Sequence, residues 1–462
     1  MKHSDLPHWS ARAAEWAATY HDTIRDRPVR PDVTPGDTLA QLATAPPETP
    51  TPMAEIFADF EQIVPGAMTH WQHPRFFAYF PSNAAPASML GEQLANAMSA
   101  QCMLWQTSPA ATEMEIRMVD WLRQALGLPD GFVGTIQDSA TTATFCAILT
   151  MRERALGWAG LEDGLAGGPR LRIYASVENH SSIDKGVRLA GIGQRNLVKI
   201  ASDATGAMDV DALRDAITAD RAAGFLPAGI VACAGGTSTG AFDRIADVIA
   251  VARDEGLYSH VDAAWSGSAM ICPEFRALWA GVEGADSIVF NPHKWLGTNF
   301  DCSIQFLANP TPHVKTLGLR PAYLETAGQE DIINFNEWTV PLGRRFRALK
   351  LWFLLRAHGL EDLRARIRNH VAWTEMAAAE VAKWDGFEIV TPPRLALFTF
   401  AAGDNARTEA LLEAVNADGR IYLTQTMLGG RYVIRMTIGQ FDTTEDDVRF
   451  ALAVIREMAA TV

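Results

Sequence analysis

The sequence predicts an α/β fold in which a large domain with a mainly parallel sheet is followed by a small α+β domain. Between about Gly91 and Arg347, helical stretches such as "ATTATFCAILTMRERAL" alternate with short β-rich runs such as "LRIYASV" and "AGIVACAG". This alternation is typical of parallel strands joined by crossover helices. The last hundred or so residues mix helices with strands such as "RYVIRMTIG" without that alternation. Such a mixture is typical of a small α+β domain.

The N-terminal part of the chain is predicted to form an arm. The segment from Pro28 to Pro52 carries seven prolines, which suits an extended strap over another surface better than a packed helix. A chain of 462 residues also exceeds what one hydrophobic core usually organises. We therefore expect an N-terminal helical strap with a substrate-pocket segment (1–85), a large domain (86–350) and a small C-terminal domain (351–462).

The charge and the cysteine content argue against several classes of function. With 40 basic and 54 acidic side chains the formal charge is −14, which argues against a nucleic-acid groove or an anionic membrane surface as the partner. The 5 cysteines include no C-x-x-C pair, so we expect neither a disulfide framework nor a metal site. No signal peptide or membrane-length apolar run is recognisable, so a soluble, cytoplasmic protein is expected.

The stretch "FNPHKWLGTNFDCS" contains Lys294 in apolar surroundings. Most lysines in such a position bury the stem of the side chain and keep the amine at the surface. A lysine can also form a Schiff base with a carbonyl cofactor. If that cofactor is pyridoxal phosphate, the site needs a carboxylate for the ring nitrogen, a cradle for the phosphate and a flat group against the ring.

Candidates for these groups follow the predicted strands. Asp262 comes directly after a β-rich run in "LYSHVDAAWSGSA", where an acid is either a turn former or a partner for a ring nitrogen. The small residues Ala263 and Ala264 would let a flat ring lie against the backbone. His180, in "SVENHSSIDKG", is either a structural histidine in a turn or a flat ring stacked on the cofactor.

A phosphate site is predicted where an apolar strand turns into a helix. In "GTIQDSATTATFCAIL", Ser139, Ala140 and Thr141 occupy the start of that helix. They form either an ordinary helix cap or a phosphate cradle, because free amides and hydroxyls meet at a helix N-terminus. Asn291 could add another donor to the same phosphate.

These motifs resemble those of the group II pyridoxal-phosphate-dependent decarboxylases, most closely the aromatic-L-amino-acid decarboxylases. The resemblance covers nearly the whole chain, including "THWQHPRFFAYFPSNA", "HVDAAWSGSAMICPEFR" and "PLGRRFRALKLWFLLR". It implies the type I pyridoxal-phosphate fold, which is aspartate-aminotransferase-like, and a homodimer with active sites at the subunit interface and the N-terminal segment wrapped around the partner. It also implies decarboxylation of an aromatic L-amino acid (tryptophan, phenylalanine, tyrosine or dihydroxyphenylalanine) to the aryl amine and carbon dioxide.

The resemblance also implies roles for individual residues. Lys294 resembles the Schiff-base lysine, Asp262 the partner of the ring nitrogen and His180 the ring-stacking histidine. The other cofactor-binding residues that it implies are Ser139, Ala140, Thr141, Thr237, Ala264, Asn291 and His293. The substrate pocket that it implies consists of Trp71, Tyr79, Phe80, Pro81, Gln101, Met103 and Gly343. An aromatic wall suits an indole or phenyl side chain, whereas an acidic substrate would need a basic residue there.

The sequence departs from the amine-forming relatives in one loop. In those relatives a loop tyrosine of the other subunit protonates the carbon that has lost carbon dioxide, and counting back from Trp338 puts Phe335 at that position. Phenylalanine has no proton to give. Phe335 therefore resembles the residue of the aromatic acetaldehyde synthases, which use oxygen to form an aldehyde, ammonia and peroxide. Alternatively, His180, Lys294 or water delivers the proton in place of the loop tyrosine. Tyr323 matches a separate family tyrosine further upstream.

Two other functions remain open at this point. An aminotransferase or desulfurase of the same fold would share the lysine, the aspartate and the phosphate loop, although the contexts "FFAYFP" and "NPHKW" argue against it. A cofactor-binding dimer that has lost catalysis is the other alternative. The presence of every cofactor residue that the resemblance implies argues against that function.

Overall fold

The computed structural model describes residues 1–319 and 332–462, which divide into two compact units. The first unit contains Met1–Pro81, Glu375–Val390 and Thr399–Val462. The second unit contains Ser82–Thr374 and Thr391–Phe398. The domain boundaries expected after residues 85 and 350 remain predictions.

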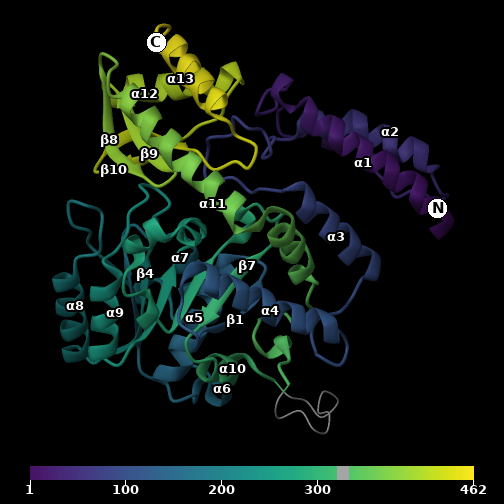
Figure 1. The fold of residues 1–462 in the computed structure, drawn as a ribbon. Helices are drawn as coiled ribbons and strands as arrows, with labels where there is room; N and C mark the ends of the chain where they lie inside the picture. The colour runs from purple at the N-terminus through teal and green to yellow at the C-terminus, as the bar shows by residue number, and fades with distance from the viewer. Residues whose placement is uncertain (320–331) are drawn as a thin grey trace. The chain divides into compact units, whose positions relative to one another are not determined.

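A seven-stranded sheet forms the centre of the second unit (Figure 1). Its strand order is β1-β7-β6-β5-β4-β2-β3, and β7 runs antiparallel to both of its neighbours. The strands are β1 (Val133–Gln137), β2 (Leu171–Ser176), β3 (Leu197–Ile200), β4 (Leu226–Cys233), β5 (Tyr258–Asp262), β6 (Ser287–Phe290) and β7 (Ser303–Leu307). The predicted mainly parallel sheet is confirmed. Because β1 to β6 share one direction, their carboxyl ends meet at one edge, where ligands bind in such sheets.

Helices cover both faces of this sheet. On β2, Ile173 and Ala175 pack with α5 and α7, whereas Arg172 and Tyr174 bond to Asp220 of α8. Successive strand residues face opposite sides, so α5 and α7 lie on one face and α8 lies on the other. The helices of this unit are α3 (Pro86–Met98), α4 (Pro109–Leu126), α5 (Ala140–Ala155), α6 (Gly160–Asp163), α7 (Ser182–Leu189), α8 (Val210–Ala222), α9 (Ile245–Asp254), α10 (Thr311–Leu317) and the start of α11 (Arg347–Val381). The helical backbone of α11 is broken at Gly359, whose φ is 65°.

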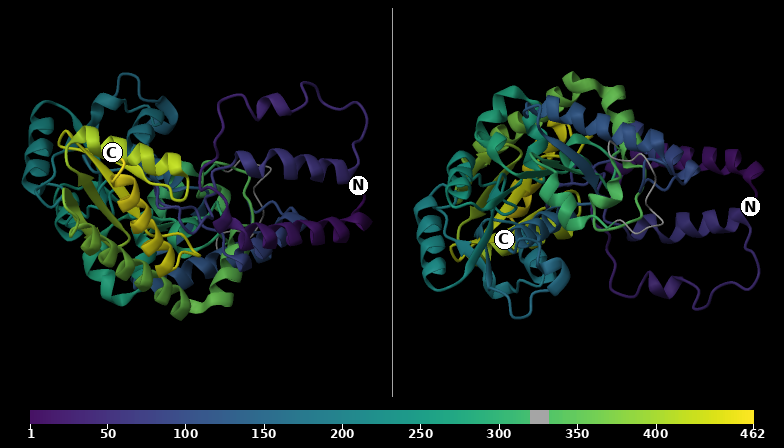
Figure 2. Two further views of the ribbon diagram at one scale, coloured as in Figure 1. Left: turned by 90° about the horizontal axis from the view of Figure 1, so that it is seen from above. Right: turned by 90° about the horizontal axis from the view of Figure 1, so that it is seen from below.

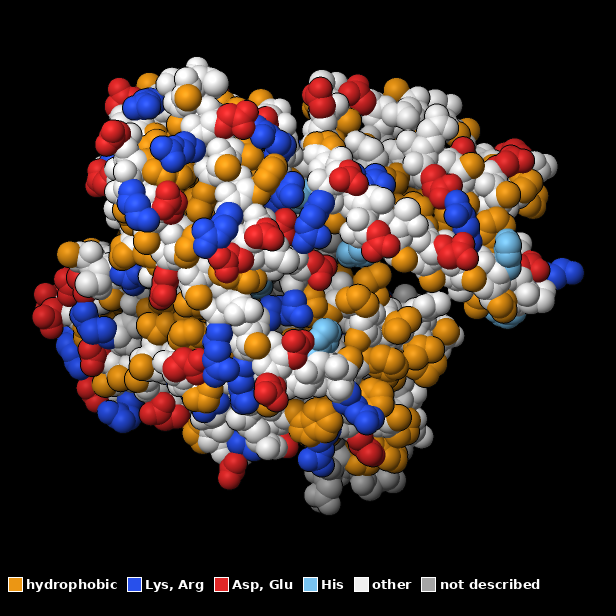
Figure 3. Space-filling model, turned by 45° about the horizontal axis from the view of Figure 1, so that its top comes forward, with side chains coloured by type: hydrophobic (Ala, Val, Ile, Leu, Met, Phe, Trp, Pro, Cys, Tyr) orange, Lys and Arg blue, Asp and Glu red, His pale blue; other side chains and the backbone are white. Residues whose placement is uncertain are grey.

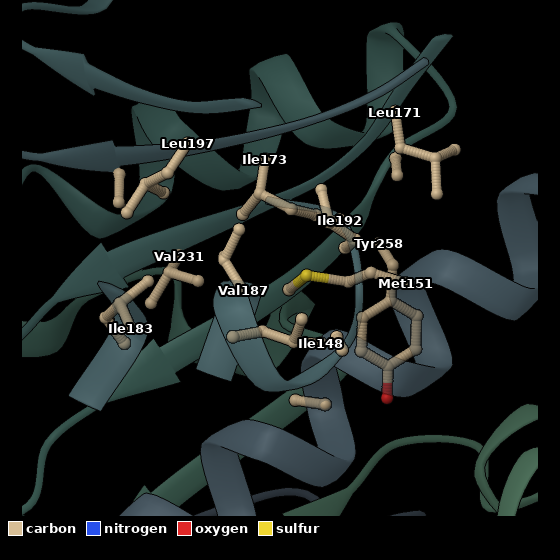
Figure 4. Packing of buried hydrophobic residues seen from close by; sticks show 14 residues of the cluster. Ile148, Met151, Leu171, Ile173, Ile183, Val187, Ile192, Leu197, Val231 and Tyr258 are labelled. Carbon is tan, nitrogen blue, oxygen red and sulfur yellow. The ribbon is translucent and has the colours of Figure 1, made fainter. Parts of the chain in front are cut away.

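Figure 4 shows the apolar core between the sheet and helices α5 and α7. Ile148 and Met151 of α5 pack with Val187 of α7, Ile173 of β2 and Tyr258 of β5, and all of these side chains are buried. Complete burial of such a side chain stabilises the fold by about 1.5–3 kcal/mol. This core holds together the strands whose carboxyl ends carry the predicted site residues.

A buried ion pair joins α4 to the segment that precedes α11. Arg344 donates to the two carboxylate oxygens of Glu115 at 2.7 and 3.0 Å, and the side chains are 2% and 4% exposed. Glu115 also accepts from the Thr135 hydroxyl and the Ile136 backbone N–H, while Arg344 donates to the Ile136 carbonyl. The pair is therefore embedded in a hydrogen-bond network around β1.

Loss of one partner of this ion pair should be strongly destabilising. We expect Arg344→Met to lower the free energy of unfolding by about 3–5 kcal/mol, because it leaves the Glu115 carboxylate buried without its cation. The double variant Arg344→Met/Glu115→Leu should regain most of this loss, since it removes both charges. Urea denaturation followed by tryptophan fluorescence measures both values. An equal loss in the single and double variants would contradict this account.

The first unit contains the N-terminal arm. Helices α1 (Leu6–Asp22) and α2 (Met53–Ile63) lie side by side, with the Trp16 and Phe60 ring centroids 4.8 Å apart and Arg12 bonded to Glu61 at 2.6 Å. Figure 2 shows the segment between these helices as an extended arc with little regular structure. This is the conformation that its prolines predict.

The rest of the first unit is built around a second sheet. This four-stranded sheet has the order β10-β11-β9-β8, and α12 packs against β11 and α13. The elements of this part of the chain are β8 (Phe387–Arg394), β9 (Leu397–Ala402), α12 (Asn405–Asp418), β10 (Thr424–Leu428), β11 (Arg431–Thr437) and α13 (Glu445–Ala459). The end of β8 and the start of β9, within Thr391–Phe398, belong to the second unit. The predicted mixture of strands and helices near the C-terminus is confirmed. Within residues 1–319 and 332–462, no helix combines the length and hydrophobicity needed to cross a membrane.

Candidate active site

A cavity of about 190 Å³ lies at the carboxyl ends of the parallel strands in the second unit. Every residue predicted to bind the cofactor lines it: Ser139, Ala140, Thr141, His180, Thr237, Asp262, Ala264, Asn291, His293 and Lys294. These residues follow β1, β2, β4, β5 and β6, which are far apart in sequence. Pockets for drug-sized ligands begin at roughly 300 Å³. The smaller volume here suits a ligand with a single ring.

Lys294 lies in a single π-helical turn, Pro292–Leu296, directly after β6. The Lys294 N–H donates to the Asn291 carbonyl at 3.0 Å, and the Asn291 N–H donates to the Ala264 carbonyl at 2.9 Å. Gly297 ends the turn with a φ of 104°, a conformation that favours glycine. The turn therefore places the lysine beside the end of β5.

Asp262 is the last residue of β5 and is 7% exposed. It pairs with Cys233 of β4 on one side and with Val289 of β6 on the other. The Ala264 N–H donates to its Oδ1 at 3.0 Å, so Oδ2 is the oxygen that remains for a ligand. The carboxylate is thus fixed on the strand next to the one that leads to Lys294.

The start of α5 provides an anion site in the same cavity. Ser139 caps the helix, and its Oγ accepts from the Thr142 N–H at 3.2 Å. Amides in the first turn of a helix have no partner within the helix and favour an anion. Asn291 accepts at Oδ1 from the Ser303 hydroxyl, which leaves its Nδ2 as a donor. Both groups suit a phosphate.

His180 precedes α7 and is fixed by Ser182. The Ser182 backbone N–H donates to Nδ1 at 3.1 Å, and the Ser182 Oγ lies 2.9 Å from the same nitrogen. Since Nδ1 accepts, the proton of the neutral ring is on Nε2. Burial lowers the pKa of His180, and Asp262 partly opposes this while Lys294 adds to it. The ring is therefore neutral at physiological pH, with a donor at Nε2.

His293 is neutral for similar reasons. Burial, with a further contribution from Lys294, lowers its pKa to about 3. Its Nδ1 accepts from the Cys302 N–H at 3.0 Å. Lys294 is thus flanked by an uncharged imidazole.

The cavity also contains residues that the sequence did not identify: Ser182, Cys233, Gly235, Gly236 and Trp265. Cys233 ends β4 as Asp262 ends β5, so the rule of looking directly after each strand would have found it. Trp265 donates from Nε1 to the Gly235 carbonyl at 2.6 Å and forms part of the wall. Nothing in the local sequence indicated that contact.

The predicted substrate-pocket residues fall into two groups. Trp71, Tyr79, Phe80 and Pro81 belong to the first unit, where the Trp71 and Tyr79 rings stack with centroids 5.9 Å apart. Gln101, Met103 and Gly343 belong to the second unit. The Gln101 Oε1 accepts from the Arg344 N–H at 2.7 Å, and its Nε2 lies 3.1 Å from where a Cβ on Gly343 would be. The assembly of these groups into one pocket remains a prediction.

Phe335 does not line the cavity. Its ring is 1% exposed and packs with Leu307 and Trp338, and the Arg344 guanidinium lies 4.9 Å from its centroid. The role of Phe335 in place of a loop proton donor remains a prediction. Tyr323 lies outside the described residues.

The cavity residues together meet the requirements of pyridoxal phosphate. An amine, a single carboxylate, a helix N-terminus with amide and hydroxyl donors, and a neutral imidazole line one space. Ala140, Ala264, Gly235 and Gly236 leave room for a flat ring. This set of groups matches the needs of an aldehyde, a ring nitrogen and a phosphate on one molecule.

Comparisons with known proteins point to the same chemistry. Residues 35–402 match the family model of the pyridoxal-dependent decarboxylase conserved domain. The chain is 39% identical to the aromatic-L-amino-acid decarboxylase of Bos taurus, across 100% of this chain and 97% of that protein. It is 36% identical to the phenylacetaldehyde synthase of Arabidopsis thaliana, across 100% of this chain and 97% of that protein. The crystal structure of Oryza sativa TDC with PLP and tryptamine matches with a TM-score of 0.97 and 34% identity, covering 100% of this chain and 99% of that one.

Proposed function

This chain belongs to the family of pyridoxal-dependent decarboxylases, and we propose that the cavity around Lys294 is its active site. The protein is a carboxy-lyase that uses pyridoxal phosphate to release carbon dioxide from an aromatic L-amino acid. The observation that carries the proposed site is the convergence of Lys294, Asp262, His180 and the start of α5 on one cavity.

The residues of the cavity have distinct roles in this proposal. With pyridoxal phosphate bound, the Lys294 amine would hold the cofactor aldehyde, the start of α5 and Asn291 would hold the phosphate, and Asp262 would favour a proton on the ring nitrogen. The bound cofactor supplies an electron-poor ring that stabilises the charge left when carbon dioxide departs. The small lining residues would leave room for the flat ring.

His180 acts beside the ring. Its flat imidazole would pack against the cofactor ring, and its Nε2–H would be available to an anionic group such as the substrate carboxylate. Ser182 supports this role, because its hydrogen bonds to Nδ1 keep the proton on Nε2. An imidazole held in one orientation loses little freedom when the substrate binds.

Product analysis tests the function. Purified protein with pyridoxal phosphate is incubated with tryptophan, phenylalanine, tyrosine or dihydroxyphenylalanine, in air and without oxygen, and carbon dioxide, amine, aldehyde and peroxide are quantified. We expect amine and carbon dioxide in equal amounts from at least one substrate, with little peroxide. Aldehyde with matching peroxide, lost without oxygen, would identify the oxygen-dependent reaction. A keto acid as product would identify an aminotransferase.

Phe335→Tyr tests the oxygen-dependent alternative directly. We expect the amine-to-aldehyde ratio to stay unchanged, because the ring is buried beside Leu307 and Trp338 and not in the cavity. The free energy of unfolding should fall by about 1–3 kcal/mol, because the added hydroxyl is buried among apolar groups. Product analysis and urea denaturation measure these effects. A switch from aldehyde in the wild type to amine in the variant would show that Phe335 decides the product.

We also propose that the protein is a homodimer. On α3, Leu90, Leu94 and Met98 are spaced along one helix face and are 56%, 49% and 55% exposed, while Gly91 packs closely against the Lys350 backbone. Figure 3 shows hydrophobic side chains gathered at the lower right, the side on which Figure 1 draws α3. Exposed apolar patches of this kind are typical of subunit interfaces.

Hydrodynamic mass tests the dimer. Leu94→Arg should weaken the association of the two subunits, since it introduces a charge among the exposed apolar side chains Leu90, Leu94 and Met98 of α3. Leu161→Arg, at an exposed leucine on α6, is the matched control and should leave the mass unchanged. A wild-type protein that stays monomeric at micromolar concentration would contradict the proposal.

A cytoplasmic location is proposed as well. The cysteines Cys102, Cys146, Cys233, Cys272 and Cys302 are all buried free thiols, which fits a reducing compartment. Cell fractionation tests this location.

A further inference from the structure

Asn83 lies against the turn that carries Lys294, although the two residues are far apart in sequence. Its side chain is fully buried. The Asn83 backbone N–H donates to the His293 carbonyl at 3.0 Å, and its Nδ2 donates to the Lys294 carbonyl. A carbonyl oxygen can only accept, so the nitrogen end of the amide must face Lys294. One residue therefore holds two successive carbonyls of the turn.

These contacts are needed because the turn is short. Carbonyls near the end of a helical turn have no partner further along the helix. The Lys294 backbone N–H donates to the Asn291 carbonyl at 3.0 Å, and the Lys294 backbone carbonyl accepts from Asn83 Nδ2. The lysine backbone is thus fixed on both sides. Two residues after Asn83, the Ala85 N–H donates to the Gly297 carbonyl at 2.8 Å, at the end of the same turn.

We propose that Asn83 is a positioning residue that sets the location of the Lys294 amine through the hydrogen bond from its Nδ2 to the Lys294 carbonyl. The proposal rests on the proposed function of Lys294 as the residue that bonds the cofactor. Asn83 touches neither cofactor nor substrate in this role. Asn83 also follows Tyr79, Phe80 and Pro81 of the predicted substrate wall by a few residues. One short segment therefore contains both the predicted wall residues and the residue that contacts Lys294.

Two substitutions separate positioning from simple filling of space. Asn83→Asp keeps the shape of the side chain but replaces the donor by an acceptor, which is repelled by the Lys294 carbonyl. Asn83→Ala removes the contact without adding a charge. If Asn83 positions the turn, the Asp variant should bond the cofactor more slowly than the Ala variant. If Asn83 only fills space, the order should be reversed.

Ser88→Ala is the matched control. Ser88 is also fully buried, and its hydroxyl bonds to Asn299 in the same loop at 2.6 and 2.9 Å. The substitution disturbs the same pair of segments without touching the Lys294 carbonyl. Thermal denaturation of all variants shows whether they are folded. If Asn83→Asp does not fold, the proposal is tested by comparing the rate of cofactor bonding in Asn83→Ala with that in Ser88→Ala.

The first readout is the rate at which the protein without cofactor bonds pyridoxal phosphate, followed by absorbance and by borohydride reduction with mass spectrometry at Lys294. We expect this rate to fall about fivefold or more in Asn83→Ala, further in Asn83→Asp, and not in Ser88→Ala. The second readout is kcat, which should follow the same order while KM changes less. Wild-type rates in both Asn83 variants, or a larger loss in Ala than in Asp, would overturn the proposal.

These outcomes also separate the two proposals. If the wild type released no carbon dioxide from any amino acid, the proposed function would fail. The order of cofactor bonding among the variants would still test the role of Asn83, because that readout does not depend on decarboxylation.

Discussion

Lys294→Arg is expected to lower kcat by at least about a thousandfold, which corresponds to about 4 kcal/mol in the activation barrier. The guanidinium keeps the positive charge next to His293, but it does not act as a nucleophile toward the cofactor aldehyde. The turn that holds Lys294 should persist, because its contacts with Asn291 and Asn83 are made by the backbone of Lys294. The loss should therefore come from the missing bond to the cofactor and not from unfolding.

Steady-state kinetics and mass spectrometry after borohydride reduction check this result together. The wild type should gain the mass of the reduced cofactor at the peptide that contains Lys294, and the variant should not. Lys185→Arg, at an exposed lysine in the middle of α7, is the matched control and should keep both the label at Lys294 and the activity. Normal turnover by Lys294→Arg, or labelling at another lysine, would show that Lys294 does not hold the cofactor.

The sequence predicted which residues would meet in one cavity because these residues follow strands. Asp262, Asn291 and Ser139 each lie at or directly after a strand of the large sheet, and parallel strands bring these positions to one edge. The motifs around them are local, so their roles could be inferred without knowing the full fold. The same reasoning would have found Cys233 at the end of β4.

Contacts between distant segments were not predictable in this way. Asn83 reaches Lys294 across 211 positions of the chain, and no spacing rule connects the two. Counting along a loop also did not indicate that Phe335 packs with Leu307 and Trp338 in an apolar cluster, and its catalytic position remains a prediction. Sequence indicates which residues end a strand more reliably than it indicates which way a loop residue points.

The carboxylate of Asp262 provides a second large effect. Asp262→Asn should lower kcat by about a hundredfold or more, because the neutral amide no longer favours a positive charge on the ring nitrogen. The amide oxygen can still accept from the Ala264 N–H, and the β5 backbone pairs with β4 and β6 unchanged. The substitution therefore changes the charge at Oδ2 while keeping the shape of the site.

The position of Asp262 explains why this charge cannot easily be replaced. The carboxylate is 7% exposed and is the acidic side chain among the residues that line the cavity. In a poorly hydrated site a charge interacts more strongly with a nearby cation than it would in water. Asp262→Glu keeps the charge but lengthens the side chain, so it should retain more activity than Asp262→Asn and less than the wild type.

Absorbance of the bound cofactor and steady-state kinetics together measure the effect of each variant. We expect Asp262→Asn still to bond the cofactor through Lys294, with weaker binding and a much lower kcat. An Asp262→Asn variant that decarboxylates at the wild-type rate would show that the ring nitrogen does not need this carboxylate. A variant that neither binds the cofactor nor resists urea like the wild type would assign Asp262 a structural role at the end of β5.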